Sequence, residues 1–228
     1  MTTGVLDGRR AVVTGVDTDL GRGLKQALVE AGAETVGHAS DGLDTPEAAD
    51  ATAERWITHL GGPVDVFVHA AMPAIAFERI DFTDVDDARW EAVWEGAMRS
   101  TLFALQRVYR QMLGRGGRIV LVTPTVAMSG AERLVPYTTA VEGQRLLAKS
   151  AARQWGPDGI TVNCLAPAPE HVPIGVESRS VSLAPPALGG PGDVIWDLGP
   201  VAVWLVSDAA HFVTGATISA DGGVWMAP

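Results

Sequence analysis

The sequence of 228 residues has one cysteine, Cys164, and no stretch of about 20 uninterrupted apolar residues. One thiol supports neither an intrachain disulfide nor a multi-cysteine zinc site, so we expect Cys164 to be a small buried residue. The five histidines form no i, i+4 pair on one helix, and we predict no metal site. Without an apolar run or an apolar signal core near the start of the chain, we expect no membrane-spanning segment and a cytoplasmic protein.

Basic residues are also scarce, with 17 lysines and arginines against 27 acidic residues and a formal net charge of -10. A nucleic acid requires a basic face to meet its phosphate backbone, and an anionic membrane surface requires the same. We therefore expect neither as a partner. The hydrophobic fraction of 47% is sufficient for one sizeable core, which predicts a single domain over residues 1–228.

Short apolar runs alternate with segments of helical periodicity along the chain. Such alternation implies right-handed crossovers and an open α/β parallel sheet that is covered by helices on both faces. Residues 167–200 are rich in proline, glycine and serine and predict a long irregular loop. Strands are expected at 11–14, 35–38, 64–70, 119–122, 160–165 and 213–219, and helices at 20–31, 45–60, 83–113, 137–155 and 200–208.

Two details of this pattern can be tested directly against a structure. Thr83 with Asp86 three residues later resembles a capping box that would start the helix at 83–113. Ligands of open parallel sheets bind at the carboxyl ends of the strands, so the loops after Thr14, Ala70, Val122 and Leu165 should surround one crevice.

Seven sequence landmarks occur in a specific order. They are Thr14-Gly15 with Gly21, the runs 66–71 and 117–120, Tyr137, the run 160–163 with Pro167, Thr214-Gly215, and the run 221–223. Together they resemble the short-chain dehydrogenase/reductase family over essentially the whole chain. The resemblance implies a Rossmann-like, doubly wound sheet that binds NAD(P). It also implies catalytic Asn, Ser, Tyr and Lys residues and oligomers packed through two long helices.

The catalytic set implied by the resemblance is largely replaced in this chain. The serine position, thirteen residues before Tyr137, falls on Pro124. Thr123 and Thr125 flank this proline, and either is a candidate for the missing hydroxyl. The helix asparagine aligns with Ala97, which cannot relay a proton. We therefore single out Tyr137, Thr123 and Thr125 as the candidate catalytic residues.

The family's lysine, four residues beyond the tyrosine on the same helix face, is replaced by Val141. Without that cation, a tyrosine near its ordinary pKa of about 10 is a poor base at neutral pH. Arg145 lies one further turn along this face. We expect it to be an exposed or interface charge rather than a substitute for the lysine.

The glycine-rich turn retains Gly15 and Gly21 but has Asp19 in place of the middle glycine. A carboxylate beside the pyrophosphate would cost roughly 4 kcal/mol at about 4 Å and an effective dielectric constant of about 20. The other interpretation is that Asp19 caps the following helix from outside the pocket. Gly15, Gly21 and Asp41, a poorly placed substitute for the ribose-binding acid, are the candidate vestiges of a cofactor site.

The chain is short between its second and third strands, because only 23 residues separate Ser40 from Val64. We expect one helix and one edge strand of the family to be missing there, which would open the adenine pocket. The family's Asn-Asn-Ala-Gly is replaced by a run from His69 to Met72. We interpret His69 as a satisfied, semi-buried histidine and expect Met72 to project into the space beside the ribose.

Three functional hypotheses remain open. The first is a degenerate homologue, a non-catalytic subunit that pairs with an intact short-chain dehydrogenase or forms another homo- or hetero-oligomer through helices 83–113 and 137–155. The second is an NAD(P)-independent elimination, hydration or cyclisation that uses Tyr137. The third is a residual NAD(P)-dependent oxidoreductase of a carbonyl or alcohol substrate. The first two hypotheses need no cofactor.

Overall fold

The computed structural model describes residues 4–175 and 184–226. Six strands form one sheet in the order β2-β1-β3-β4-β5-β6, and every neighbouring pair is parallel. The α/β parallel sheet predicted from the alternating pattern is confirmed. The strands are β1 (Arg10–Thr14), β2 (Glu34–His38), β3 (Val66–His69), β4 (Gly117–Val122), β5 (Ile160–Pro167) and β6 (Thr217–Ala220).

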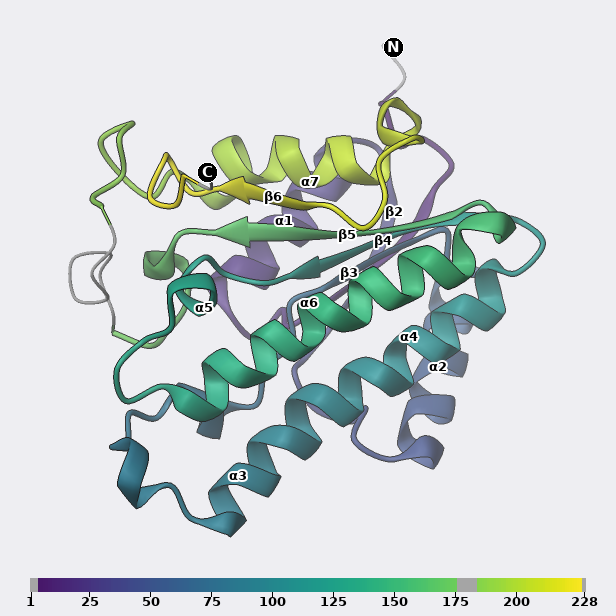
Figure 1. Ribbon diagram of the computed structural model, residues 1–228. Helices are drawn as coiled ribbons and strands as arrows, with labels where there is room; N and C mark the ends of the chain where they lie inside the picture. Colours follow the sequence, from purple (N-terminus) through teal and green to yellow (C-terminus); the bar gives the residue numbers. More distant parts are fainter. Residues whose placement is uncertain (1–3, 176–183, 227–228) are drawn as a thin grey trace.

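Helices cover both faces of this sheet, as Figure 1 shows. One face carries α1 and α7, whose apolar side chains pack on the strands in one buried cluster. The opposite face carries α2, α4 and α6, which belong to a second cluster. The helices are α1 (Asp19–Glu30), α2 (Pro46–Leu60), α3 (Asp87–Val93), α4 (Ser100–Met112), α5 (Val126–Ser129), α6 (Val135–Trp155) and α7 (Gly199–Val206).

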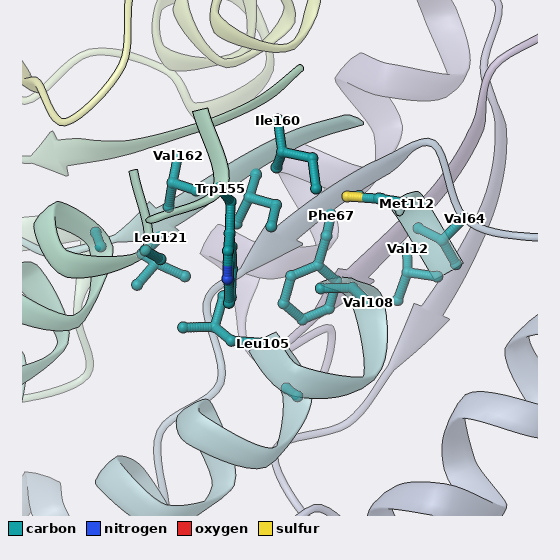
Figure 2. Packing of buried hydrophobic residues seen from close by; sticks show 14 of the residues in the cluster. Val12, Val64, Phe67, Leu105, Val108, Met112, Leu121, Trp155, Ile160 and Val162 are labelled. Atoms are coloured by element: carbon teal, nitrogen blue, oxygen red, sulfur yellow. The ribbon is translucent and has the colours of Figure 1, made fainter. Parts of the chain in front are cut away.

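The two clusters follow from the alternation of side chains along each strand. Val12 faces α2, α4 and α6, whereas its neighbour Val13 faces α1 and α7. Phe67, Leu105 and Trp155 fill the space between the sheet and the long helices (Figure 2). Burying one such side chain stabilises the fold by roughly 1.5–3 kcal/mol.

The connection between β2 and β3 is as short as the sequence predicts. A single helix, α2, lies between these strands, and β2 is an edge of the sheet in the described residues. The helix starts at the expected Thr45 cap, whose side chain accepts the N–H of Ala48, and Pro46 occupies the first turn. The expected loss of one helix and one edge strand is confirmed.

The predicted start of the helix at 83–113 is wrong. Asp86 caps α3 by accepting the N–H of Arg89 at 2.8 Å, whereas the Thr83 hydroxyl contacts only the neighbouring Asp84. A widened π-helical turn, Trp94–Arg99, then separates α3 from α4. The periodicity predicted one helix because apolar spacing alone does not reveal such a turn.

The last strand also begins later than predicted, at Thr217 rather than at Val213. The Asn163 side chain donates to the carbonyl of Val213 at 2.8 Å and accepts the N–H of Ala216 at 3.1 Å. The Asn163 side chain thus hydrogen-bonds to backbone groups that would pair with a neighbouring strand if the last strand began at Val213. The predicted irregular loop at 167–200 contains short helical turns at Pro169–His171 and Val194–Leu198, and its residues 176–183 lie outside the described residues.

Candidate functional site

The glycine turn between β1 and α1 is closely packed. Gly15 has a φ of +79°, and a Cβ atom built there would lie 2.5 Å from the carbonyl oxygen of Ala70. A Cβ atom at Gly21 would lie 2.1 Å from the carbonyl oxygen of Gly15. Both contacts are too short for any side chain, so these two positions require glycine for packing, whether or not a ligand binds.

Thr18, not Asp19, caps α1. The Thr18 hydroxyl donates to the carbonyl of Gly15 at 2.8 Å and accepts the N–H of Gly21 at 3.1 Å. Asp19 is the first residue of the helix, where its side chain is 96% exposed and pairs with Arg22. The interpretation of Asp19 as the cap is therefore wrong. Because water surrounds this carboxylate, its repulsion of an anion at about 4 Å falls to about 1 kcal/mol.

A cavity of about 420 Å³ lies between the glycine turn and the end of β2. The carboxylates of Asp17, Asp41 and Asp44 line it, and no basic residue does. Ser40 donates to Asp17 at 2.8 Å, which fixes that carboxylate at the rim. Carboxylates accept hydrogen bonds from hydroxyl groups and repel phosphates, so this cavity suits a sugar diol better than a phosphorylated sugar. Asp17, in the turn before α1, is a second carboxylate that the sequence places near the pyrophosphate, and the structure puts it at this cavity instead. Asp44 was missed in the sequence because its position depends on how the shortened connection folds.

A second cavity, of about 410 Å³, lies over the start of α1 and reaches the turn after β5. Asp19, Arg22 and His171 are among the residues that line it. In the first turn of α1 the N–H groups of Gly21 and Arg22 donate to Thr18, which leaves those of Asp19 and Leu20 for an anion. The glycine turn thus retains both the shape and the donors of an anion site, despite Asp19.

Tyr137 is enclosed where the crevice was predicted. Tyr137 is 1% exposed, and none of the hydrogen bonds among the described residues involves its hydroxyl. Burial raises the pKa of this hydroxyl well above its usual value of 10. The cavity beside it measures about 20 Å³, room for roughly one water molecule. Met72, Phe77 and Pro124 line it, and it shares Thr18 and His171 with the cavity over the start of α1 that is described above.

The two candidate threonines do not join Tyr137 in this cavity. Thr125 donates its hydroxyl to the carbonyl of Pro167 at 3.1 Å. The Thr123 hydroxyl has no nitrogen or oxygen partner among the described residues and lies beside the buried Cys164 thiol. Both threonines are fully buried, and only Pro124 between them lines the cavity. Their catalytic role, like that of Tyr137, stays a prediction.

Arg145 is buried, contrary to the expectation of an exposed or interface charge. It is 6% exposed and donates to the carbonyl of Thr123 at 3.2 Å and to the Thr217 hydroxyl at 3.4 Å. Glu142, one turn earlier on α6, pairs with it at 3.0 Å. The guanidinium therefore ties α6 to the ends of β4 and β6, and it makes no contact with Tyr137.

His69 is the centre of a buried polar network, and the prediction of a satisfied histidine is confirmed. Its Nδ1 lies 2.8 Å from the Thr14 hydroxyl and its Nε2 lies 2.8 Å from the Thr101 hydroxyl. Thr101 donates to the carbonyl of Ala97 and accepts from Gln144, so the histidine proton belongs on Nε2. Burial lowers the pKa of His69 to about 4, which keeps the ring neutral near pH 7.

A family model described as enoyl-(acyl carrier protein) reductase matches residues 6–225. The chain belongs to the short-chain dehydrogenase/reductase family. A 2-dehydro-3-deoxy-D-gluconate 5-dehydrogenase of Dickeya dadantii is 29% identical over 97% of both chains. A 3-oxoacyl-(acyl-carrier-protein) reductase of Vibrio cholerae is 26% identical over 97% of this chain and 99% of its own.

Solved structures of this family have the same fold. A protein from Sinorhizobium meliloti described as a short-chain alcohol dehydrogenase is 28% identical, with a TM-score of 0.84 over 96% of this chain and 97% of its own. A gluconate 5-dehydrogenase from Burkholderia cenocepacia, solved with NADP and tartrate, is 24% identical, with a TM-score of 0.82 over 96% of each chain.

In residues 4–175 and 184–226, no group of three or more histidine, cysteine, aspartate or glutamate side chains is arranged to hold a metal ion. In the same residues, none of the helices combines the length and apolar character needed to span a bilayer.

Proposed function

We propose that this member of the short-chain dehydrogenase/reductase family does not transfer hydride and acts as a subunit that pairs with an intact homologue. The observation that carries the proposal is the 20 Å³ cavity beside Tyr137. Hydride transfer needs the nicotinamide ring and a substrate carbonyl or alcohol next to the tyrosine, and this space holds about one water molecule.

The chemistry of the residues around Tyr137 supports the same reading. A general base must have a pKa near the working pH and must reach the proton that it removes. Burial moves the Tyr137 pKa in the opposite direction, and the neighbouring Val141 carries no charge to bring it down. Pro124 has no hydroxyl to hold a substrate oxygen.

NAD(P), the cofactor of the family, fits this chain only in part. The cavities of about 420 and 410 Å³ on either side of Asp17 leave room for the adenosine and diphosphate groups. The carboxylates around the first cavity favour the free ribose of NAD over the phosphorylated ribose of NADP. The nicotinamide end has no comparable space, so no catalytic step is assigned to the cofactor.

The surface of the two long helices supports a subunit role. Figure 1 shows α4 and α6 side by side across one face of the molecule, and Gln144 of α6 donates to Thr101 of α4. Trp94, Leu102 and Leu146 on these segments are 41%, 40% and 64% exposed. Large apolar side chains at such exposure gain most from a second helical surface, because association removes them from water.

Co-expression with an intact short-chain dehydrogenase encoded beside this gene tests the proposal. Native mass spectrometry should find a mixed oligomer that is more stable than either homomer. Leu146→Glu should weaken the mixed oligomer at least tenfold, because it places a charge in an apolar interface. The matched control is Val29→Glu, at a 44% exposed position of α1 on the opposite face of the sheet.

Two results would count against the subunit role. One is a homomer that ignores the intact relative, and the other is a mixed oligomer that Leu146→Glu and Val29→Glu affect equally. The first would leave the chain without the proposed partner. The second would move the interface away from α6.

A residual oxidoreductase remains the second candidate, and the retained glycine turn together with the dehydrogenase relatives favours it. The relatives named for gluconate-type substrates make sugar acids the first compounds to test with NAD and NADP. Turnover that disappears in Tyr137→Phe would establish this function. NAD(P)-independent chemistry at Tyr137 would require the same variant to abolish an elimination, hydration or cyclisation in the absence of dinucleotide.

A further inference from the structure

A cavity lined by arginines lies at the opposite end of the sheet from the crevice. It measures about 600 Å³ and is bounded by the turn before β4, the turn before β5 and the segment before β1. These turns lie at the end of the sheet away from the arrowheads in Figure 1. Arg9, Arg115 and Arg118 line the cavity, and Asp158 is its only acidic lining residue among those described. This local charge is opposite in sign to the net charge of the chain.

The acidic partners of these arginines are too few to neutralise them. Asp208 accepts from Arg9 at 2.8 Å and from Arg118 at 3.2 Å through the same oxygen. Asp65 is likewise shared, between Arg115 and Arg10. Two carboxylates therefore form ion pairs with four guanidinium groups.

Some N–H donors of these arginines have no hydrogen-bond partner among the described residues. In the described part of the chain, Arg9 donates only through Nη2, which leaves its Nε and Nη1 without a partner. Arg118 donates to the Gly117 and Gly159 carbonyls and to Asp208, and its unpartnered Nε is buried away from the cavity. Arg9 and Arg118 bind the same oxygen of Asp208, so their guanidinium groups lie close together. A single tetrahedral anion can therefore contact both. Guanidinium groups bind phosphate oxygens through paired, charge-assisted hydrogen bonds.

The turn before β4 leaves the cavity open. Gly114 and Gly116 have φ values of +75° and +74°, a backbone region that other residues rarely adopt. Arg115 lies between them, and its guanidinium pairs with Asp65 and donates to the carbonyl of Gln111 at 3.2 Å. The cavity of about 600 Å³ is an open depression at the surface, which a compact anion can reach without a movement of the backbone.

We propose that this cavity binds a phosphate-bearing small molecule, independently of the crevice and of the subunit role. Inorganic pyrophosphate is the probe, titrated calorimetrically at constant ionic strength into the full chain. Arg115→Gln should weaken binding about tenfold, because it removes one charged donor pair. Asp208→Asn should strengthen binding several-fold, because it releases Arg9 and Arg118 from a carboxylate whose side chain is 73% exposed.

The control separates this site from the anion donors of the glycine turn. Arg22 lines the cavity at the start of α1, so Arg22→Gln should leave the affinity unchanged if pyrophosphate binds at the arginine cavity. A loss confined to Arg22→Gln would overturn the proposal. So would the absence of binding at millimolar pyrophosphate in both the unmodified chain and Asp208→Asn.

Discussion

The hydroxyl of Tyr137 makes no hydrogen bond to a described residue, and it is not among the buried side-chain atoms that lack a partner, because Tyr137 lines a small cavity. Removing this hydroxyl therefore breaks no hydrogen bond within the described part of the chain. Tyr137→Phe should change the free energy of unfolding less than the loss of a hydrogen bond would, by less than about 0.5 kcal/mol. Denaturant titration measures this, and Tyr109→Phe is the control because its hydroxyl donates to Asp158 at 3.1 Å. Stabilisation by Tyr109→Phe together with destabilisation by Tyr137→Phe would show that the Tyr137 hydroxyl, and not that of Tyr109, contributes to folding.

His69 gives the fold a defined dependence on pH. Its pKa in the folded chain is about 4, below the unfolded value of about 6.5, so the unfolded chain binds the proton more readily. The contribution of the neutral His69 ring to the free energy of unfolding is fully present above pH 6.5. It is lost as the pH falls toward 4, by about 3 kcal/mol in total. His69→Asn, with a side chain that does not titrate, should lack this component.

The measurement is the free energy of unfolding of both proteins between pH 7 and pH 4. His38 also has a lowered pKa through burial and is present in both, so its contribution cancels in the comparison. Parallel pH curves for the two proteins would contradict the role given to His69.

Sequence spacing located residues better than it oriented their side chains. The register of β4 and α6 brings Pro124 next to Tyr137, as the count of thirteen residues implies. The directions of Thr123 and Arg145 depend on contacts with β5 and β6, which are remote in sequence. Those contacts turn the threonine away from the crevice and bury the arginine. No local pattern carries that information.

At the scale of elements, Arg145 joins α6 to two strands. Arg145→Met should lower the free energy of unfolding by about 2–3 kcal/mol, because the Thr123 carbonyl loses its charged donor inside the protein. Arg153→Met, at an exposed position of the same helix, is the matched control and should change it little. Equal effects of the two substitutions in a denaturant titration would show that the buried contacts contribute nothing.

The elements themselves were predictable where apolar periodicity and end signals agreed. The Thr45 cap with Pro46 predicted the start of α2, and Gly61, at a φ of +61°, ends it. The prediction failed where side chains compete for backbone groups, as Asn163 does before β6. The π-helical turn before α4 was also missed, because it alters the hydrogen-bond pattern without altering the apolar spacing.

At the scale of the whole molecule, the sheet and its helical layers match those of a solved structure of the family, and the glycine turn keeps Gly15 and Gly21, whereas the cavity beside Tyr137 measures only about 20 Å³. Backbone packing explains the first part, because Gly15 and Gly21 are needed for β1 and α1 to meet. Side-chain bulk at Met72, Phe77 and Pro124 explains the second. The proposal that this chain does not transfer hydride therefore concerns the crevice and not the fold.

Saturation-transfer NMR with NAD and the full chain tests this separation most directly. If the crevice beside Tyr137 is closed, the adenine protons receive saturation while the nicotinamide protons receive none, or no proton of the dinucleotide receives any. The account would be contradicted if the unmodified chain transferred strong saturation to the nicotinamide protons. The same saturation should then disappear in Val141→Trp, which adds bulk next to Tyr137.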